Sequence, residues 1–390
     1  MSKLGDICTV YAGTGFPIKY QGNANGNYPF YKVGDIAKNV MRGNVFLTLC
    51  ENYIDEEVCS AIRGTIVPAN TVVFAKIGEA VKLNRRAITS SDCLIDNNVM
   101  GIKPNESIIH LHYFYHFMCG LKLEKYAEAT TVPSVKKTIV EKIDIPLPPL
   151  ETQHKIAANL DKVTHIIDLC NAILEKLDLL VKSRFVEMFG DCKYTIVKTS
   201  DICDFITKGT TPPANEIYED YSEDRIPFLK VYNLSFTGDL LFKQEPQYIS
   251  KSTHEGKLSR SKVFPNDVLM NIVGPPLGKF SVVTNEYPEW NINQAIAIFR
   301  AKEKVIPQYL MSALMQPDVL RPFLEQAVGI RQLNLSLEQC RNLEIPLPPL
   351  ALQQQFAAFV EQTDKSKLAV KQVLQKAETL KKALMQEYFG

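Results

Sequence analysis

Two long stretches of the chain repeat apolar residues at alternating steps of three and four. These stretches, 151–189 and 351–389, contain neither proline nor glycine. This spacing places the apolar side chains on one face of a helix and predicts a coiled-coil seam. At 1.5 Å per residue, each stretch predicts a helix of roughly 58 Å. The seam residues are Ile156, Leu160, Val163, Ile167, Leu174, Leu177 and Val181 in the first helix, and Phe356, Phe359, Val370, Val373, Leu380 and Leu384 in the second.

The first predicted helix is also apolar outside its seam. Ile166, Leu169 and Ile173 lie off the three-four pattern, so its apolar stripe is too wide for a single partner helix. The second helix instead has a polar interruption in its seam at Thr363 and Ser366.

The same six residues, Ile-Pro-Leu-Pro-Pro-Leu, precede both stretches, at 145–150 and 345–350. A residue before proline is held in extended geometry, so each hexapeptide predicts a stop between a globular segment and a helix. Pro149 suits the first helical position, where its missing N–H costs nothing. Both helical stretches close on Phe-Gly, at 189–190 and 389–390. A matched stop, helix and end at one offset indicates a duplicated unit.

The segment before the first hexapeptide predicts a mixed α+β domain. Short apolar segments alternate with clusters of Gly, Pro and Asn, which is typical of strands joined by turns. The predicted strands are Val33–Ile36, Thr65–Val67, Val72–Ile77 and Val99–Ile102, and a helix is predicted over Ile108–Ala129.

The second half repeats this plan with small shifts. Gly13-Thr14 corresponds to Gly209-Thr210, Pro68 to Pro265, Asn97-Asn98 to Asn293-Gln294, and Tyr113 to Tyr309. Framework positions match while the loops between them differ, which predicts one fold used twice with two different surfaces. Two antiparallel helices from such a repeat would relate the domains by a pseudo-twofold axis.

Composition is that of a globular protein with more than one domain. Of 390 residues, 46% are hydrophobic and 22% charged, and no apolar run approaches the ~18–20 residues of a membrane span. The start of the chain lacks the apolar core of a signal peptide, so we expect a cytoplasmic protein without membrane contact. Nine cysteines without a Cys-x-x-Cys pair indicate reduced, mostly buried thiols.

The usual catalytic and cofactor motifs are missing. The segment 274–280 is one residue short of a phosphate-binding loop and lacks its hydroxyl, and no Gly-x-Gly-x-x-Gly follows a strand. No Asn/Asp-Pro-Pro-aromatic motif of a DNA amino-methyltransferase is present. His110, His112, His116 and Cys119 could offer metal ligands, but a packed aromatic helix is the favoured interpretation. We therefore predict no catalytic residues and no metal site.

A net charge of +1 does not by itself indicate a nucleic-acid binder, so DNA contact must come from local patches. Such patches carry the side chains that clamp phosphates and read base edges. The candidates are Lys19, Lys76, Lys82, Asn84, Arg85, Arg86 and Lys136 in the first half, and Lys208, Lys257, Arg260, Lys262, Asn271, Lys279, Arg331 and Gln332 in the second.

Taken together, these motifs resemble the specificity subunit of a type I DNA restriction–modification system. The resemblance covers essentially the whole chain and rests on both hexapeptides with Gln153 and Gln353 beyond them, the Gly-Thr turns, the Asn293-Gln294 pair and the long helices. It implies target-recognition domains at 1–145 and 191–345, and a proline-rich joint with a helix at 146–190 and 346–390.

Further expectations follow from the resemblance. Each recognition domain would read one half of a split, asymmetric site in double-stranded DNA. The helix pair would set the spacer and dock two methyltransferase subunits, to which restriction/translocase subunits join. This chain would hold no cofactor, because S-adenosylmethionine, ATP and Mg would belong to its partners. The alternative from a different class is a non-catalytic coiled-coil scaffold that binds protein without DNA specificity.

Overall fold

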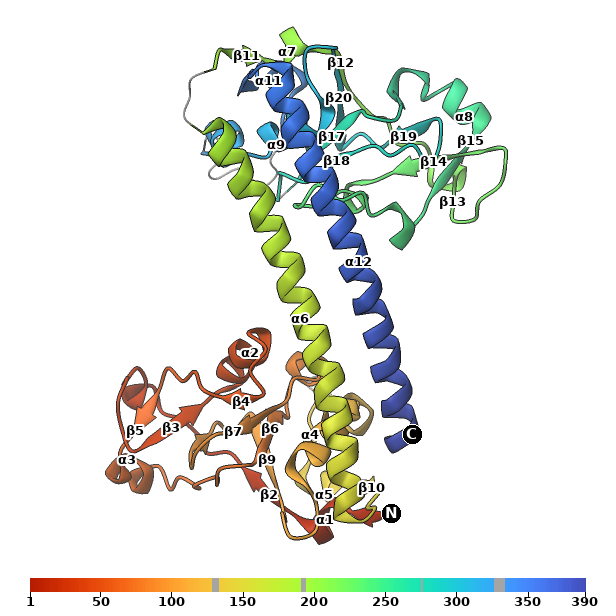
Figure 1. Ribbon diagram of the computed structural model, residues 1–390. Helices are drawn as coiled ribbons and strands as arrows, with labels where there is room; N and C mark the ends of the chain where they lie inside the picture. The colour runs from red at the N-terminus through yellow and green to blue at the C-terminus, as the bar shows by residue number, and fades with distance from the viewer. Residues whose placement is uncertain (128–132, 191–193, 275, 326–333) are drawn as a thin grey trace. The chain divides into compact units, whose positions relative to one another are not determined.

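The computed structural model describes residues 1–127, 133–190, 194–274, 276–325 and 334–390 (Figure 1). The chain divides into two compact units. Unit 1 comprises 1–172 with 371–390, and unit 2 comprises 173–370. Each unit therefore contains one globular domain and part of both long helices. The sequence predicts two recognition domains and two joint-and-helix segments, and the structure distributes these four segments over the two units. The exact bounds of the four segments stay a prediction.

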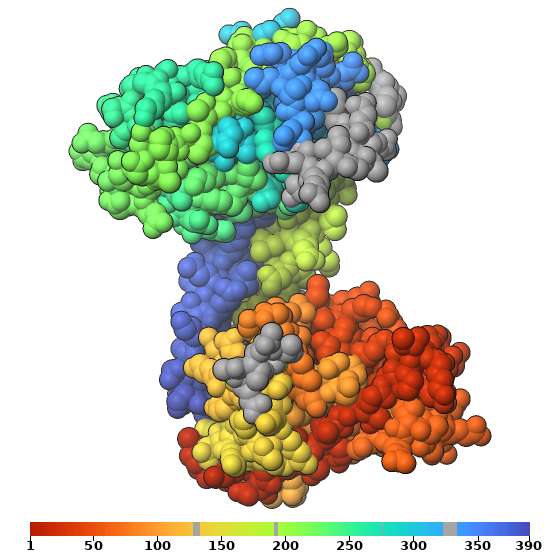
Figure 2. All heavy atoms as spheres, turned by 180° about the vertical axis from the view of Figure 1, so that it is seen from behind, coloured from red at the N-terminus to blue at the C-terminus, as the bar shows by residue number. Residues whose placement is uncertain are grey.

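The two long helices form as predicted. α6 (Leu150–Phe189) and α12 (Leu350–Phe389) are each 40 residues long and begin one residue after the last proline of a hexapeptide. The carbonyl of Pro149 accepts hydrogen bonds from the N–H groups of Thr152 and Gln153, at 2.9 and 3.1 Å. An ion pair between Lys155 and Glu151, at 2.7 Å, supports the first turn of α6. The first turns of α12 lie against the second domain in both views (Figures 1 and 2).

Unit 1 builds its domain from two main sheets. The larger has the strand order β2-β9-β6-β7-β4 and the smaller the order β5-β3-β8. At the centre, β9 (Val99–Pro104) pairs antiparallel with β2 (Cys8–Ala12) and β6 (Val72–Ala75). The other strands are β1 (Ser2–Lys3), β3 (Tyr28–Tyr31), β4 (Phe46–Leu47), β5 (Tyr53–Ile54), β7 (Ala87–Thr89), β8 (Leu94–Ile95) and β10 (Asp144–Ile145). The short helices are α1 (Leu4–Ile7), α2 (Val33–Met41), α3 (Glu56–Ala61), α4 (Leu111–Gly120) and α5 (Lys137–Val140).

Unit 2 repeats this arrangement. Its sheets have the orders β12-β20-β17-β18 and β13-β15-β14-β19-β16. Parallel pairing of β14 with β19 matches that of β3 with β8. The strands are β11 (Ile196–Lys198), β12 (Cys203–Lys208), β13 (Ile217–Tyr218), β14 (Arg225–Leu229), β15 (Tyr248–Ser250), β16 (Lys262–Val263), β17 (Val268–Asn271), β18 (Phe280–Val282), β19 (Trp290–Ile292), β20 (Ile296–Ala301) and β21 (Glu344–Pro346). The helices are α7 (Thr199–Ile202), α8 (Lys251–Glu255), α9 (Pro307–Leu314), α10 (Pro317–Glu325) and α11 (Leu337–Arg341).

Each hexapeptide is fastened to its own domain by strand pairing. Ile145 pairs with Ser2 in the sheet β1-β10, and Ile345 pairs with Val197 in the sheet β11-β21. Both isoleucines are fully buried. The Tyr113 hydroxyl donates to the Pro146 carbonyl at 2.8 Å, and the matching Tyr309 hydroxyl donates to Pro346 at 2.6 Å. The two copies of the hexapeptide thus make the same strand pairing and the same tyrosine hydrogen bond, each in its own unit.

A glutamine in the first turn of each long helix completes the joint. Gln153 and Gln353 are both fully buried. The side-chain amide of Gln153 donates to the carbonyls of Pro148 and Ile108, at 2.8 and 3.2 Å, and its oxygen accepts from the N–H of His110 at 2.8 Å. These bonds hold the helix start against the segment that precedes α4.

Gln353 repeats these three bonds in unit 2. Its amide donates to Pro348 and Lys304, at 2.9 and 3.2 Å, and its oxygen accepts from the N–H of Ile306 at 2.9 Å. Because a residue before proline cannot continue a helix, the direction of each long helix depends on these glutamine bonds.

The phenylalanine that ends each helix packs in the core of the other repeat. Phe389 of α12 lies against Tyr113 and Phe117 in unit 1, with ring centroids 5.1 and 5.7 Å apart. Phe189 of α6 lies against Tyr309 and Phe356 in unit 2, at 5.0 and 5.7 Å. Within each unit, the start of one helix therefore lies beside the end of the other, and the two run antiparallel.

The predicted seam of α6 is confirmed, since all seven of its residues are buried or half-buried, while Ile166, Leu169 and Ile173 are more than 40% exposed. In α12 the prediction is partly wrong. Val373 and Leu380 are each 49% exposed, and the inward positions are one residue further along. The inward set is Phe356, Val360, Thr363, Lys367, Val370, Leu374, Ala377, Lys381, Leu384 and Tyr388. Two residues of this inward set are lysines, so the apolar pattern in the sequence does not indicate the correct seam positions.

Three local predictions in the first domain also differ from the structure. Val33–Ile36 is the first turn of α2 rather than a strand, because the Asp35 carboxylate accepts from the N–H of Lys32 at 2.8 Å and caps a helix. The helix expected over Ile108–Ala129 ends at Gly120, and its last two residues lie outside the described part. The segment Thr65–Val67 contributes only a single bridge, from Val67 to Cys93.

Candidate nucleic-acid interface

Five loop segments of unit 1 form a continuous polar edge. The N–H of Thr65 donates to the Thr14 hydroxyl at 3.2 Å, and the Thr14 carbonyl accepts from the N–H of Asn97 at 3.1 Å. The N–H of Lys76 then donates to the Asn98 carbonyl at 2.9 Å, and the Lys76 carbonyl binds the next segment, at 134–136. We call segments 63–65, 13–15, 96–98, 76–78 and 134–136 the polar edge of unit 1.

Unit 2 has a polar edge in the same order. The Arg260 guanidinium donates to the Thr210 hydroxyl at 3.2 Å, and the N–H of Gly209 donates to Ile296 at 3.1 Å. The N–H of Ile272 donates to Ala295 at 2.8 Å, and the Ile272 carbonyl accepts from Leu335 at 2.9 Å. The polar edge of unit 2 is defined as Arg260 with segments 209–210, 293–296, 272–274 and 334–335.

Glycine is required where the turn crosses the sheet. A Cβ on Gly13 would lie 1.9 Å from the Asp96 carbonyl oxygen, and one on Gly209 would lie 2.2 Å from that of Asn293. The turn therefore lies directly on the end of β8 or β19, and the neighbouring side chains project from a fixed backbone. A rigid edge of this kind can present amide, hydroxyl and cationic donors to a polyanion.

Several predicted DNA-contact residues lie on or next to these edges. Lys76 and Lys136 belong to the edge of unit 1, and Lys136 is exposed. Lys19 is exposed just beyond the Gly-Thr turn, with its ammonium 4.6 Å from the centre of the Tyr20 ring. Lys208 directly precedes the turn of unit 2 and is exposed, as is Arg260. Their role in DNA contact stays a prediction.

Three of the predicted contacts are structural residues instead. Arg86 is 2% exposed, and its guanidinium donates to the carbonyls of Met118 and Arg85, at 3.2 and 2.9 Å. Burial lowers its pKa to about 10. Asn84 has a positive φ of 51° and accepts from Arg86 at 2.7 Å. The prediction of DNA contact by Arg86 is wrong because the fold buries its guanidinium and uses its donors. Asn84 is half-buried and its amide donates to the Cys119 carbonyl at 2.8 Å, so its main role is to support this turn.

Asn271 is the third. It is 1% exposed, its oxygen accepts from the N–H of Lys279 at 2.7 Å, and its amide donates to Pro276 at 3.1 Å. It therefore closes the loop that follows β17. Lys279 itself is half-buried, with its ammonium 5.7 Å from the centre of the Phe236 ring.

Other predicted contacts are paired with acidic neighbours or are not described. Lys82 lies 2.8 Å from Glu79, and Lys257 is paired with Glu216. Arg85 is half-buried. Arg331 and Gln332 lie outside the described residues. Surface ion pairs of this kind are weak, so pairing lowers the local positive potential without excluding DNA contact.

Lys262 neutralises a small acidic cluster. Its ammonium lies 2.7 Å from Glu255 and 3.9 Å from Glu289, while the buried His254 ring contacts Glu289 at 3.1 Å. His254, Glu255 and Glu289 could together hold a cation by geometry. The ammonium of Lys262 already pairs with Glu255, and Glu289 contacts the His254 ring, so we interpret the cluster as structural.

The histidines of α4 bind a carboxylate of α6. His112 Nδ1 lies 2.9 Å from one oxygen of Asp161, and His116 Nε2 lies 2.7 Å from the other. Partial burial alone would raise the pKa of Asp161, but the two histidines outweigh it and hold that pKa well below its usual range. The hydrogen bond to Asp161 in turn raises the pKa of His112. These contacts clamp α4 to the start of α6.

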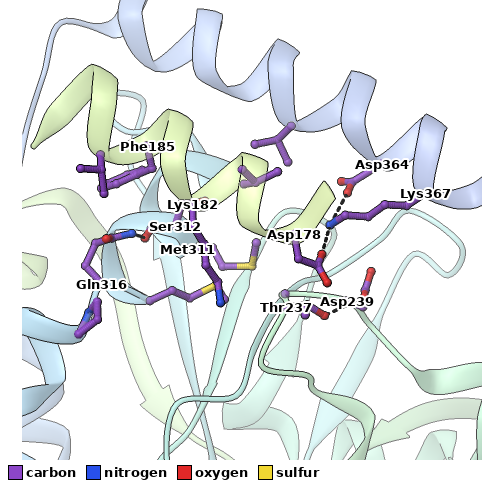
Figure 3. A pocket seen from close by; sticks show the side chains of 16 residues that line it. Asp178, Lys182, Phe185, Thr237, Asp239, Met311, Ser312, Gln316, Asp364 and Lys367 are labelled. Atoms are coloured by element: carbon purple, nitrogen blue, oxygen red, sulfur yellow. Dashed lines mark hydrogen bonds and ion pairs between the residues drawn. The ribbon is translucent and has the colours of Figure 1, made fainter. Parts of the chain in front are cut away.

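A cavity of about 340 Å³ lies in unit 2 beside both long helices (Figure 3). Phe185, Met311 and Val360 supply apolar lining. At its rim, the ammonium of the buried Lys367 lies 2.6 Å from Asp178 and 3.5 Å from Asp364. The large apolar side chains exposed on the long helices are Leu150, Ile166, Leu169, Val373 and Leu380 in unit 1, and Ile173, Leu179, Leu180, Val186, Leu350 and Leu368 in unit 2. Exposed apolar side chains of this kind, in each unit, are suited to protein contact.

The thiols are poor candidates for nucleophiles. Burial raises the pKa values of Cys8, Cys203 and Cys340 to about 12, so all three are protonated near neutral pH. Among the described residues, every cysteine is free of a disulfide. No helix in the described part of the chain has the length and apolarity needed to cross a membrane.

The chain is thus an internal duplication in which two domains share one fold. Each domain has a polar edge, and the side chains on the two edges differ. The model of the type I restriction modification DNA specificity domain matches residues 1–179 and again 192–381. The chain belongs to this family. The match supports DNA specificity rather than the alternative of a scaffold without it.

Individual relatives agree with the family assignment. The EcoBI specificity subunit of Escherichia coli is 25% identical over 70% of this chain, and the MjaIX specificity subunit of Methanocaldococcus jannaschii is 22% identical over 93%. The chain spans 63% of the length of the first relative and 85% of the second. The crystal structure of a type I S subunit from M. genitalium covers 100% of this chain and 95% of its own, with a TM-score of 0.61 and 12% identity. That likeness concerns the fold.

Proposed function

We propose that this chain is the DNA-specificity subunit of a type I restriction–modification complex, and that each of its domains reads one half of a bipartite, asymmetric site. The observation that carries the proposal is the pair of polar edges. The two edges have the same order of segments and the same glycine turn, but different side chains. A framework kept constant under varied donors is suited to reading two different base sequences.

The long helices would provide the spacer and the docking surface for two methyltransferase subunits. Leucine, isoleucine and valine side chains exposed on α6 and α12 support this role, because exposed apolar side chains favour a protein partner. Restriction/translocase subunits would join the same core. S-adenosylmethionine, ATP and Mg would be bound by those partners, and this chain would contribute recognition rather than catalysis.

Methylome sequencing of a host that expresses this chain with its methyltransferase subunit tests the proposal. The expected result is methylation at one split motif, absent when the chain is omitted. Methylation that does not depend on the chain, or that follows an unsplit motif, would contradict it.

Docking is tested separately by co-purification with the methyltransferase subunit. A Leu179→Asp variant is expected to lose the partner, because Leu179 is 60% exposed on α6 and a carboxylate there opposes apolar contact. Leu83→Asp is the matched control, since Leu83 is 56% exposed but lies outside the long helices. Equal retention of the partner by both variants would place the docking surface elsewhere.

A further inference from the structure

Arg63 occupies a backbone position that favours glycine. The helix α3 ends in a hydrogen-bonded turn in which the N–H of Arg63 donates to Ser60 at 3.1 Å and the N–H of Gly64 donates to Cys59 at 2.8 Å. This is the Schellman arrangement, and Arg63 sits at its left-handed residue with a φ of 52°. A side chain at this position carries a conformational cost that glycine does not.

The neighbouring helix shows the usual solution. α2 ends in the same arrangement, with the N–H of Gly43 donating to Val40 at 3.0 Å and the N–H of Asn44 donating to Asn39 at 3.0 Å. There the left-handed residue is Gly43, with a φ of 78°. The other described non-glycine residues with positive φ are all asparagines, which tolerate this conformation. Arg63 is thus the exception, and the fold gains nothing evident from its side chain.

The location of Arg63 explains why an arginine is useful there. It begins the polar edge of unit 1, two residues before Thr65, whose N–H binds the Thr14 hydroxyl at 3.2 Å. Arg63 is exposed, and no carboxylate among the described residues forms an ion pair with it. Gly64 packs closely against its neighbours, because a Cβ there would lie 2.3 Å from the Leu94 side chain. The exposed side chain of Arg63 therefore starts from a loop that is hydrogen-bonded to the Gly-Thr turn, where it is available to a ligand.

Unit 2 carries an arginine at the matching place. Arg260 is separated from Arg63 by the same number of residues as Pro265 from Pro68. It too follows a short helix, α8, whose preceding strand β15 pairs with β14 as β5 pairs with β3 in unit 1. Its guanidinium donates to Thr210, the counterpart of Thr14, at 3.2 Å. Two units whose loops otherwise differ thus both carry an exposed arginine on the loop next to the Gly-Thr turn.

We propose that Arg63 reads a base in the half-site recognised by unit 1, by donating two hydrogen bonds to a guanine edge. This proposal rests on the proposed function and names a residue for it. A guanidinium offers two parallel donors that match the O6 and N7 acceptors of guanine. A strained backbone that fixes the direction of the side chain serves such a contact, whereas a phosphate contact tolerates a flexible lysine.

The test uses the full chain with its methyltransferase subunit and a fluorescent duplex that carries the motif found by methylome sequencing. Arg63→Gly removes the side chain and relieves the backbone. We expect binding at least tenfold weaker and an unchanged or raised Tm. We further expect that Arg63→Gly no longer discriminates against substitution of one guanine in the half-site of unit 1. Arg63→Lys should lose most of that discrimination while keeping the charge.

Arg42→Gly is the matched control, since Arg42 is an exposed arginine next to the left-handed residue of the α2 turn. It should bind within about twofold of the wild type. The proposal is overturned if Arg63→Gly binds as tightly as the wild type, if its Tm falls, if Arg42→Gly weakens binding equally, or if Arg63→Lys discriminates normally. If the wild-type complex itself shows no split motif, the proposed function fails rather than the role of Arg63.

Discussion

Replacing Gln353 by leucine tests whether the glutamine bonds hold the joint together. Gln353 is fully buried and makes three hydrogen bonds, to Pro348, Lys304 and Ile306, at 2.9, 3.2 and 2.9 Å. Leucine has a similar volume but no donor or acceptor, so the variant leaves these backbone groups without their partner. The loss is therefore polar and creates little cavity.

The loss in free energy of unfolding depends on which of the three backbone groups water cannot reach in the variant. Pro348 is buried and Ile306 is half-buried, so their backbone groups lose hydrogen bonds that water replaces poorly, whereas Lys304 is exposed and its carbonyl can be hydrated. An orphaned buried group costs about 1–3 kcal/mol, so we expect unit 2 to lose about 2–4 kcal/mol. With a urea m-value of about 2 kcal/mol/M, the midpoint should fall by about 1–2 M.

The chain contains its own probe for this measurement. Trp290 is the single tryptophan, is fully buried, and lies in unit 2, so its fluorescence reports the unfolding of that unit. Gln153→Leu is the matched control, because it removes the same three bonds from unit 1. It should leave the tryptophan transition nearly unchanged. Circular dichroism reports both units, so the part of that transition that comes from unit 1 should move to a lower urea concentration. A tryptophan midpoint that moves by less than about 0.3 M in Gln353→Leu would refute the reasoning.

Three further predictions concern the helices. The raised pKa of His112 adds stability that is present below about pH 6.5 and is lost as pH rises through that pKa. The lowered pKa of Asp161 adds stability that is present above about pH 4 and is lost as pH falls through that pKa. Asp161→Asn should therefore lower the Tm most between about pH 4 and 6.5, as calorimetry across pH would show, and a pH-independent loss would contradict the clamp. Asp178→Ala should destabilise unit 2 by about 2–3 kcal/mol in the Trp290 assay by leaving the buried Lys367 without its nearer carboxylate, whereas Asp178→Leu with Lys367→Met should be close to neutral. Equal losses would show that the pair is not coupled. Inserting one heptad in both α6 and α12 should lengthen the unspecified spacer by up to about three base pairs, and an unchanged spacer in the methylome would rule out a ruler role.

The duplicated arrangement of domains and long helices can be predicted from the sequence because each repeat carries the same local sequence motifs. The hexapeptides and the absence of proline and glycine over 150–189 and 350–389 predict both long helices, and the structure confirms them. Gln153 and Gln353 were recognised as a matched pair, but the three bonds of each go to residues more than 40 positions away or across a proline joint, and a sequence pattern carries no signal for such contacts.

Register and burial of charged residues were not accessible in the same way. The seam of α12 was misplaced by one residue at alternate positions because Lys367 and Lys381 point inward, and an apolar pattern selects Phe359 and Val373 instead. A cluster of cations predicts surface contact for Arg86, whereas its guanidinium is buried and donates to backbone carbonyls. Arg63 was missed, since a left-handed backbone is visible only in the structure.

The central claim is that each unit specifies one half of the DNA site independently. Replacing residues 1–145 by the corresponding domain of another specificity subunit, and sequencing the methylome of a host that carries the hybrid with its methyltransferase, tests this claim most directly. We expect one half of the split motif to change while the other half and the spacer are kept. A motif in which both halves change, or neither does, would contradict it.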